Sequence, residues 1–113
     1  MNNDFYVRFK DSIGEIQKAG DAYALARADS YYRQEMTKVI LSRLQIACGE
    51  IPVSKSELQA RASQDYESHL KETAEAIKKE HKLKNALEVA KAKFEGNRSL
   101  SSLEKATLKE IGQ

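Results

Sequence analysis

The chain has 113 residues, of which 41% are apolar and 32% are charged, with one proline, five glycines and no tryptophan. This composition is typical of one small helix-rich domain, residues 1–113, with a limited core. Nineteen basic residues against 17 acidic ones leave a net charge of +2, so the overall charge indicates no particular class of partner.

The cysteine content and the apolar runs limit where the protein is expected to act. A single cysteine, Cys48, cannot form an intramolecular disulfide, and the first residues lack the apolar run of a signal peptide. No apolar stretch approaches the roughly 20 residues that span a bilayer. We therefore expect a cytoplasmic protein with no membrane partner.

The first predicted element is a short helix over residues 3–19. Its apolar residues recur at helical spacings of four, four and three: Phe5, Phe9, Ile13 and Ile16. Asn2 or Asn3 is the expected N-cap. Gly20 followed by Asp21 predicts a stop and a new N-cap, because glycine weakens a helix and aspartate caps one.

A long helix is predicted over residues 22–48. Its apolar stripe contains Leu25, Ala28, Tyr32, Met36, Val39 or Ile40, Leu44 and Ala47. Gly49 follows at the position where a left-handed C-terminal cap belongs.

A turn over residues 49–54 and a second long helix over 55–95 follow. Ser54 with Glu57 three residues later has the spacing of a capping box, and Pro52 ends the preceding segment. The stripe of this helix contains Leu58, Ala62, Tyr66, Leu70, Thr73, Ile77, Leu87, Ala90 and Phe94.

A short terminal helix is predicted over residues 101–111. Gly96 and Asn97 indicate a kink or break before it, and Ser101 with Glu104 has the spacing of a second capping box. No alternation typical of strands is present, so the sequence predicts an all-α protein.

The two long helices are expected to form an antiparallel hairpin, because about six residues join them. Each helix has more apolar surface than one partner covers. The sequence therefore predicts a homo-oligomer.

No pattern in the sequence indicates a catalytic, metal or cofactor site. The glycines are scattered, with no phosphate-binding loop, and His69 and His81 lack further metal ligands at the required spacing. Cys48 has no histidine near it in the chain that would activate it as a nucleophile. We therefore expect a protein that is not an enzyme and binds no cofactor.

Positive charge is concentrated in the second half of the second long helix. Residues 54–77 carry three basic and five acidic side chains, whereas residues 78–98 carry seven basic and three acidic ones, a local excess of +4. Such a surface binds nucleic-acid phosphates without reading bases, or it is simply the solvated face of a long helix. The candidate nucleic-acid-binding residues are Arg33, Lys38, Arg43, Lys78, Lys79, Lys82, Lys84, Lys91 and Arg98.

Over residues 21–111, the order of helices and the stretches "SRLQIACG", "ASQDYESHL" and "AKAKFEGNRSLSSLEKATLKEI" resemble small helical proteins of phage recombination clusters. More distantly, they resemble the UvsY family of recombination mediators. The resemblance implies a non-enzymatic, ring-like oligomer that binds single-stranded DNA and helps to load a recombinase onto DNA coated by a single-strand-binding protein. In a host cell, this activity would be cytoplasmic.

That family has a DNA-contacting Lys-x-Arg-Leu motif shortly before the glycine that ends its first long helix. Here Arg43 matches the arginine, Leu41 occupies the position of the lysine, and Lys38 lies about one turn earlier. The sequence therefore predicts a phage-type recombination mediator that binds single-stranded DNA. The alternative is a helical-hairpin inhibitor or scaffold that binds a protein and has no nucleic-acid role.

Overall fold

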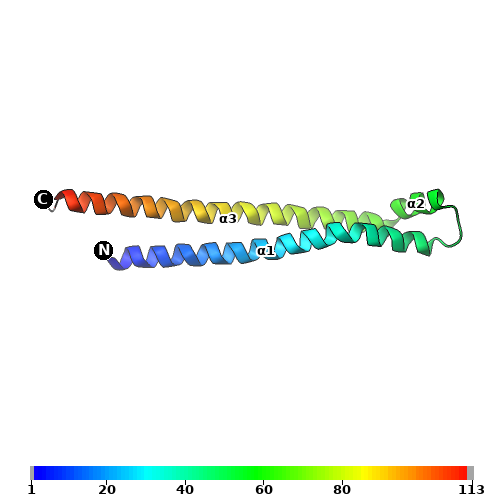
Figure 1. The fold of residues 1–113 in the computed structure, drawn as a ribbon, viewed down its shortest axis with the longest axis horizontal. Coiled ribbons are helices and arrows are strands. Elements are labelled where there is room, and N and C mark those ends of the chain that lie inside the picture. Colours follow the sequence, from blue (N-terminus) through cyan, green and yellow to red (C-terminus); the bar gives the residue numbers. More distant parts are fainter. Residues whose placement is uncertain (1, 112–113) are drawn as a thin grey trace. The chain divides into compact units, whose positions relative to one another are not determined.

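The structure is a computed structural model that describes residues 2–111. Three helices make up this part of the chain: α1 (Asn2–Ala47), α2 (Val53–Ala62) and α3 (Gln64–Ile111) (Figure 1). Residues 2–111 contain no strand, which confirms the predicted all-α class. Over the same residues, no helix is both long and apolar enough to cross a bilayer.

The described residues divide into two compact units. The terminal unit contains residues 2–23 and 82–111, and the turn unit contains Ala24–His81. Each unit therefore holds one segment of α1 and one segment of α3, and the turn unit also holds α2.

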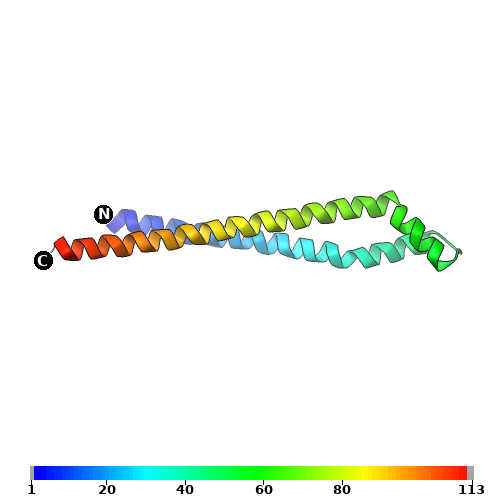
Figure 2. The ribbon, with the colours of Figure 1, turned by 90° about the horizontal axis from the view of Figure 1, so that it is seen from above.

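In the terminal unit, the segments of α1 and α3 lie side by side and run in opposite directions (Figure 2). Arg8 of α1 lies 4.0 Å from Glu104 of α3, whereas a Cβ atom at Gly20 would lie 4.0 Å from Leu87. Between these points the rings of Phe9 and Phe94 have centroids 5.3 Å apart.

The turn unit has the same antiparallel pairing. Arg33 hydrogen-bonds Glu72 at 3.1 Å, and Thr37 hydrogen-bonds His69 at 2.9 Å. Nearer the turn, the Cys48 thiol donates to the carbonyl oxygen of Ser56 at 3.9 Å. Residue numbers therefore rise along α1 as those of its partners fall.

On each helix, a set of buried or half-buried residues that includes those in contact with the other helix follows alternating spacings of three and four, the pattern of a coiled coil. We call these positions the seam. On α1 they are Phe9, Ser12, Ile16, Ala19 and Tyr23 in the terminal unit, then Ala26, Ser30, Arg33, Thr37, Ile40 and Leu44 in the turn unit. On α3 they are Tyr66, His69, Thr73, Ala76 and Glu80 in the turn unit, then Leu83, Leu87, Ala90, Phe94, Asn97 and Ser101 in the terminal unit.

The predicted end of a helix at Gly20 and Asp21 is wrong, because α1 continues through both. The two predicted helices, 3–19 and 22–48, are one. Glycine costs a helix only about 1 kcal/mol relative to alanine, and Gly20 faces α3, where packing offsets that cost. The side chains of Asn2, Asn3 and Phe5 lie outside the described part of the structure.

The predicted cap at Ser54 is also wrong. Helix α2 begins at Val53, its N-cap is Pro52, and no side chain caps it. The functioning cap is Ser63, which separates α2 from α3: its hydroxyl oxygen accepts from the backbone N–H of Tyr66 at 3.2 Å. The predicted helix 55–95 is therefore interrupted near its start.

The predicted break at Gly96 and Asn97 does not occur, and α3 continues to Ile111. The Asn97 side chain donates to the Ser12 hydroxyl at 2.9 Å, so this residue faces α1. Ser101 is not a cap, because its hydroxyl donates to the carbonyl oxygen of Asn97 within the helix. By contrast, the predicted cap at Gly49 is confirmed, since its φ is 81° and lies in the left-handed region.

The first part of the predicted stripe of α1 lies off the seam, with Leu25, Tyr32 and Met36 each one residue before a seam residue, whereas Ile40 and Leu44 lie on the seam. Leu25, Ala28, Tyr32, Val39 and Ala47 are exposed, and only Met36, Ile40 and Leu44 of the predicted set are half-buried. On the second predicted stripe, Leu58, Ala62 and Leu70 are exposed and the other members are buried or half-buried.

Candidate nucleic-acid interface

The continuity of α3 arranges its later cations in a line. Lys84, Lys91, Arg98 and Lys105 follow at intervals of seven residues, and all four are exposed. Seven residues turn an α-helix to within about 20° of its starting direction, so these side chains leave α3 on one side. We call these four residues the basic stripe; at about 1.5 Å per residue it extends roughly 30 Å along the helix.

The basic stripe is only lightly neutralised. Lys91 lies 3.9 Å from Glu88 and Arg98 lies 3.7 Å from Glu95, and all four of these side chains are more than half exposed. Such surface ion pairs contribute about 0–1 kcal/mol, so a stronger anion can displace them. Lys84 and Lys105 form no ion pair within residues 2–111.

The remaining predicted cations of α3 lie elsewhere around the helix. Lys82 is exposed and precedes Lys84 by two residues, which places it about 200° away. Lys78 and Lys79, in the turn unit, are exposed and unpaired in the described part of the chain. The structure therefore brings together only Lys84, Lys91 and Arg98 of the predicted α3 set.

Arg33 is a seam residue and is already occupied by two carboxylates. Its Nε donates to both carboxylate oxygens of Asp29 at 3.2 Å, and its Nη1 donates to Glu72 at 3.1 Å. The hydrogen bond to Asp29 and the negative charge of the Asp29 carboxylate raise the pKa of Arg33, and Glu72 has a smaller effect in the same direction. This guanidinium therefore joins α1 to α3 in the turn unit and has little charge to offer a further anion.

Lys38 and Arg43 are exposed on α1 and make no ion pair that involves residues 2–111. Five residues separate them, which corresponds to about 140° around the helix. They therefore do not form one patch with each other.

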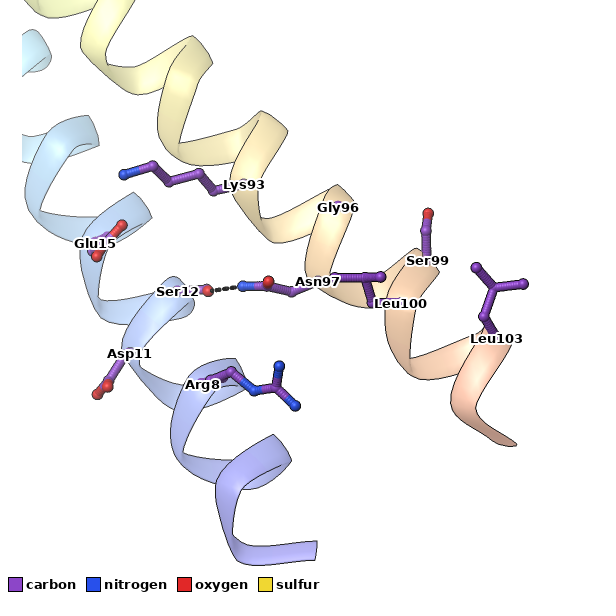
Figure 3. Close-up of a pocket in the computed structure, with 10 residues that line it drawn as sticks. All are labelled: Arg8, Asp11, Ser12, Glu15, Lys93, Gly96, Asn97, Ser99, Leu100 and Leu103. Atoms are coloured by element: carbon purple, nitrogen blue, oxygen red, sulfur yellow. Dashed lines mark hydrogen bonds between the residues drawn. The ribbon is translucent and has the colours of Figure 1, made fainter. Parts of the chain in front are cut away.

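A groove between α1 and α3 of the terminal unit lies on the other side of α3 from the basic stripe. It has a volume of about 640 Å³, and Ser12 and Asn97, whose hydrogen bond Figure 3 shows, are among the residues that line it. Both signs of charge line it, among them Arg8, Glu15 and Lys93. A smaller groove of about 330 Å³ shares Glu15 and Lys93 with it. Mixed charge gives these grooves no preference for a polyanion.

His69 and Cys48 serve the packing of the helices, whereas His81 is exposed. His69 is buried and hydrogen-bonds Thr37, and the Cys48 thiol donates to the carbonyl oxygen of Leu44 at 3.2 Å. Within residues 2–111, no group of three or more His, Cys, Asp or Glu side chains is placed to hold a metal ion.

Lys105 is the member of the basic stripe that sequence reasoning missed. The predicted set ended at Arg98, because the excess of positive charge was counted over residues 78–98. The signal was present as a basic residue at every seventh position from Lys84 onward.

No protein-family model, curated protein or solved structure matches the chain. The resemblance to the UvsY family is therefore carried only by the residues quoted above and stays a prediction.

Proposed function

We propose that this protein is a non-enzymatic, phage-type recombination accessory protein that binds single-stranded DNA as a homo-oligomer in the cytoplasm. In this proposal α1 and α3 form one antiparallel hairpin across both units. The protein assists the loading of a recombinase onto DNA that carries a single-strand-binding protein.

The basic stripe is the observation that carries the DNA part of the proposal. Four exposed cations on one side of a helix meet a polyanion without deforming the fold, and their binding releases the counterions of the phosphates. Three of the four cations are lysines, which act as point charges and read no base edges. The proposed binding is therefore independent of base sequence.

A second candidate function is favoured by the exposed apolar side chains. Leu25, Tyr32 and Ile46 of α1 and Val53 and Leu58 of α2 are all more than 60% exposed. Monomeric proteins rarely expose so many large apolar residues in one segment. A helical inhibitor or scaffold that binds a protein surface is therefore the alternative, and it needs no basic stripe.

Titration of a labelled oligo(dT) strand, followed by fluorescence anisotropy at several salt concentrations, tests the proposal. The stripe variant replaces Lys84, Lys91, Arg98 and Lys105 by glutamine. We expect weaker binding and a plot of log K against log salt that is flatter by roughly 0.7 for each phosphate that the variant no longer neutralises.

A charge-matched control separates the stripe from overall charge. Replacing Arg27, Lys55, Arg61 and Lys71 by glutamine removes the same net charge and also breaks two exposed ion pairs, Arg61 with Glu57 and Lys71 with Glu67. The control should bind as the wild type does. Equal weakening by both variants would assign the binding to overall charge and not to the basic stripe, whereas no binding of the wild type at 50 mM salt would exclude the DNA function and leave the protein-interaction one.

A further inference from the structure

A second line of residues runs along α1 in the turn unit, and each of its members up to residue 43 comes directly before a seam residue in the sequence. Leu25, Tyr32, Val39 and Ile46 follow at intervals of seven, and their exposed fractions are 75, 62, 39 and 79%. Asp29, Met36 and Arg43 lie between them, so that the spacings alternate between four and three. We call these seven residues the outer stripe.

The spacing of the outer stripe identifies the kind of surface that matches it. It has the same alternation of three and four as the seam, and it is rotated from the seam by about 100°, the turn of one residue. Large side chains at this spacing fit the holes between the side chains of another helix of the same period. A helix therefore covers this face better than a flat or irregular surface does.

The charges within the outer stripe distinguish between the possible helices. Asp29 and Arg43 stand seven residues on either side of Met36. A second copy of α1 that runs antiparallel and is centred on Met36 places Asp29 of each copy beside Arg43 of the other. A parallel copy in register would instead bring Asp29 to Asp29 and Arg43 to Arg43, which like charges disfavour.

We propose that two copies of this chain associate through their outer stripes, antiparallel and centred near Met36, in a two-fold dimer. The same arrangement brings Leu25 to within one residue of the level of Ile46, and Tyr32 to within one residue of the level of Val39, so every large apolar residue of the stripe meets another. A surface that complements itself in this way is what a two-fold interface requires. The proposal rests on the self-association within the proposed function and not on its DNA-binding part.

The two charged residues are available for this contact. Arg43 is exposed and has no ion-pair partner within the part of the chain that the structure describes. Asp29 already accepts from Arg33, but each carboxylate oxygen accepts two hydrogen bonds, so it retains the capacity for a second cation.

A charge-swap cycle measured by sedimentation equilibrium, in reducing buffer, tests the orientation. In Arg43→Glu alone, the introduced glutamate meets Asp29 at both ends of the interface; in Asp29→Arg alone, two arginines meet at both ends. Each single variant should raise the dimer dissociation constant at least about tenfold, and the double variant Asp29→Arg/Arg43→Glu should restore it. A parallel dimer predicts no such rescue, since each residue would still meet its own copy.

A second pair of variants tests the surface itself. Leu25→Gln with Ile46→Gln removes apolar contact at both ends of the outer stripe, and Val53→Gln with Leu58→Gln makes the same change at equally exposed sites on α2. Helicity measured by circular dichroism verifies that both variants are folded. Only the outer-stripe variant should dissociate to monomers.

Three results would overturn the inference. The first is a wild-type monomer at 100 micromolar, and the second is a dimer that withstands the outer-stripe changes. The third is a loss of oligo(dT) binding by the outer-stripe variant while its association is unchanged, which would assign the face to DNA. If the basic-stripe variant binds DNA as the wild type does, the DNA proposal is contradicted but the dimer proposal is not. The two proposals can therefore be contradicted independently.

Discussion

The Nε2 atom of His69 lies 2.9 Å from the hydroxyl oxygen of Thr37, so a buried imidazole on α3 is hydrogen-bonded to a seam residue of α1. The Thr37 hydroxyl also lies 3.3 Å from the carbonyl oxygen of Arg33 in its own helix, to which it can donate, and the imidazole tautomer decides which group donates between Thr37 and His69. A second hydroxyl, that of Thr73, lies 3.4 Å from the same nitrogen.

Replacing Thr37 by valine keeps the shape of the side chain and removes the hydroxyl that hydrogen-bonds His69. We expect the free energy of unfolding to fall by about 1–3 kcal/mol, the cost of a buried polar group that loses its partner. Thr107→Val is the matched control, because the Thr107 hydroxyl also donates to a carbonyl four residues earlier but is exposed and bonds no side chain of α1 within residues 2–111. Urea denaturation measures both, and equal losses of stability would contradict a stabilising role for the contact with His69.

The caps of α2 and α3 are tested by two serine substitutions. Ser63→Ala removes the acceptor for the Tyr66 N–H and should lower the free energy of unfolding by about 0.5–2 kcal/mol. Ser54→Ala should change it by less than the error of the measurement, because the exposed Ser54 side chain caps no helix. A larger loss at Ser54 than at Ser63 would restore the capping box that the sequence predicts.

Two glycines should respond to alanine with opposite signs. Gly96 lies inside α3 with open space around it, so Gly96→Ala should raise the free energy of unfolding by about 0.5–1 kcal/mol. Gly49 has a φ of 81°, and alanine there should lower it by about 1–2 kcal/mol. Thermal unfolding followed at 222 nm reports both changes. Destabilisation by Gly96→Ala would indicate that α3 breaks where the sequence predicts.

Lys82 and Lys84 give a sharper test of the basic stripe than removal of all its members. Both are exposed and unpaired within residues 2–111, but only Lys84 belongs to the stripe. Lys84→Glu should weaken oligo(dT) binding and flatten its salt dependence by roughly 0.7 or more. Lys82→Glu makes the same change of charge about 200° around the helix and should have a smaller effect. Equal effects would show that general charge, not the stripe, attracts the strand.

Much of the fold follows from the sequence, because helix type and the turn depend on local signals. The absence of alternating apolar residues predicts a protein without strands, and Gly49 predicts a left-handed cap. Each signal depends only on residues that are close together in the sequence. The helix ends that were wrongly predicted at Gly20 and Gly96 depend instead on contacts between residues that are distant in the sequence. Glycine disfavours a helix by only about 1 kcal/mol, and contacts with residues far along the chain override it, as Asn97 does by bonding Ser12.

The seam could not be identified from hydrophobicity. Leu25, Tyr32 and Val39 are larger and more apolar than Ala26 and Ser30, yet the smaller pair is buried. Small side chains allow two helices to approach closely, and a polar one such as Thr37 gains a hydrogen-bond partner from the other helix. That partner is not visible in a local pattern, so Leu25, Tyr32 and Met36 were predicted for the stripe, one residue before the seam residues that are buried or half-buried.

The same limit applied to the candidate interface. The excess of lysine after Ile77 is a property of composition, and the sequence alone reveals it. Which of these lysines share a side depends on whether α3 is continuous, and Arg33 was included because nothing nearby in the sequence shows its pairing with Glu72.

The distances along the chain between bonded residues imply an order of folding. Cys48 and Ser56 are eight residues apart and Thr37 and His69 are 32 apart, whereas Ser12 and Asn97 are separated by 85. Closing the longest of these loops costs about 2 kcal/mol more than closing the shortest, since the entropy of closure grows with the logarithm of loop length. We therefore expect the chain to close first at Gly49 and then outward, so that Thr37→Val slows refolding whereas Phe94→Ala mainly speeds unfolding in stopped-flow measurements.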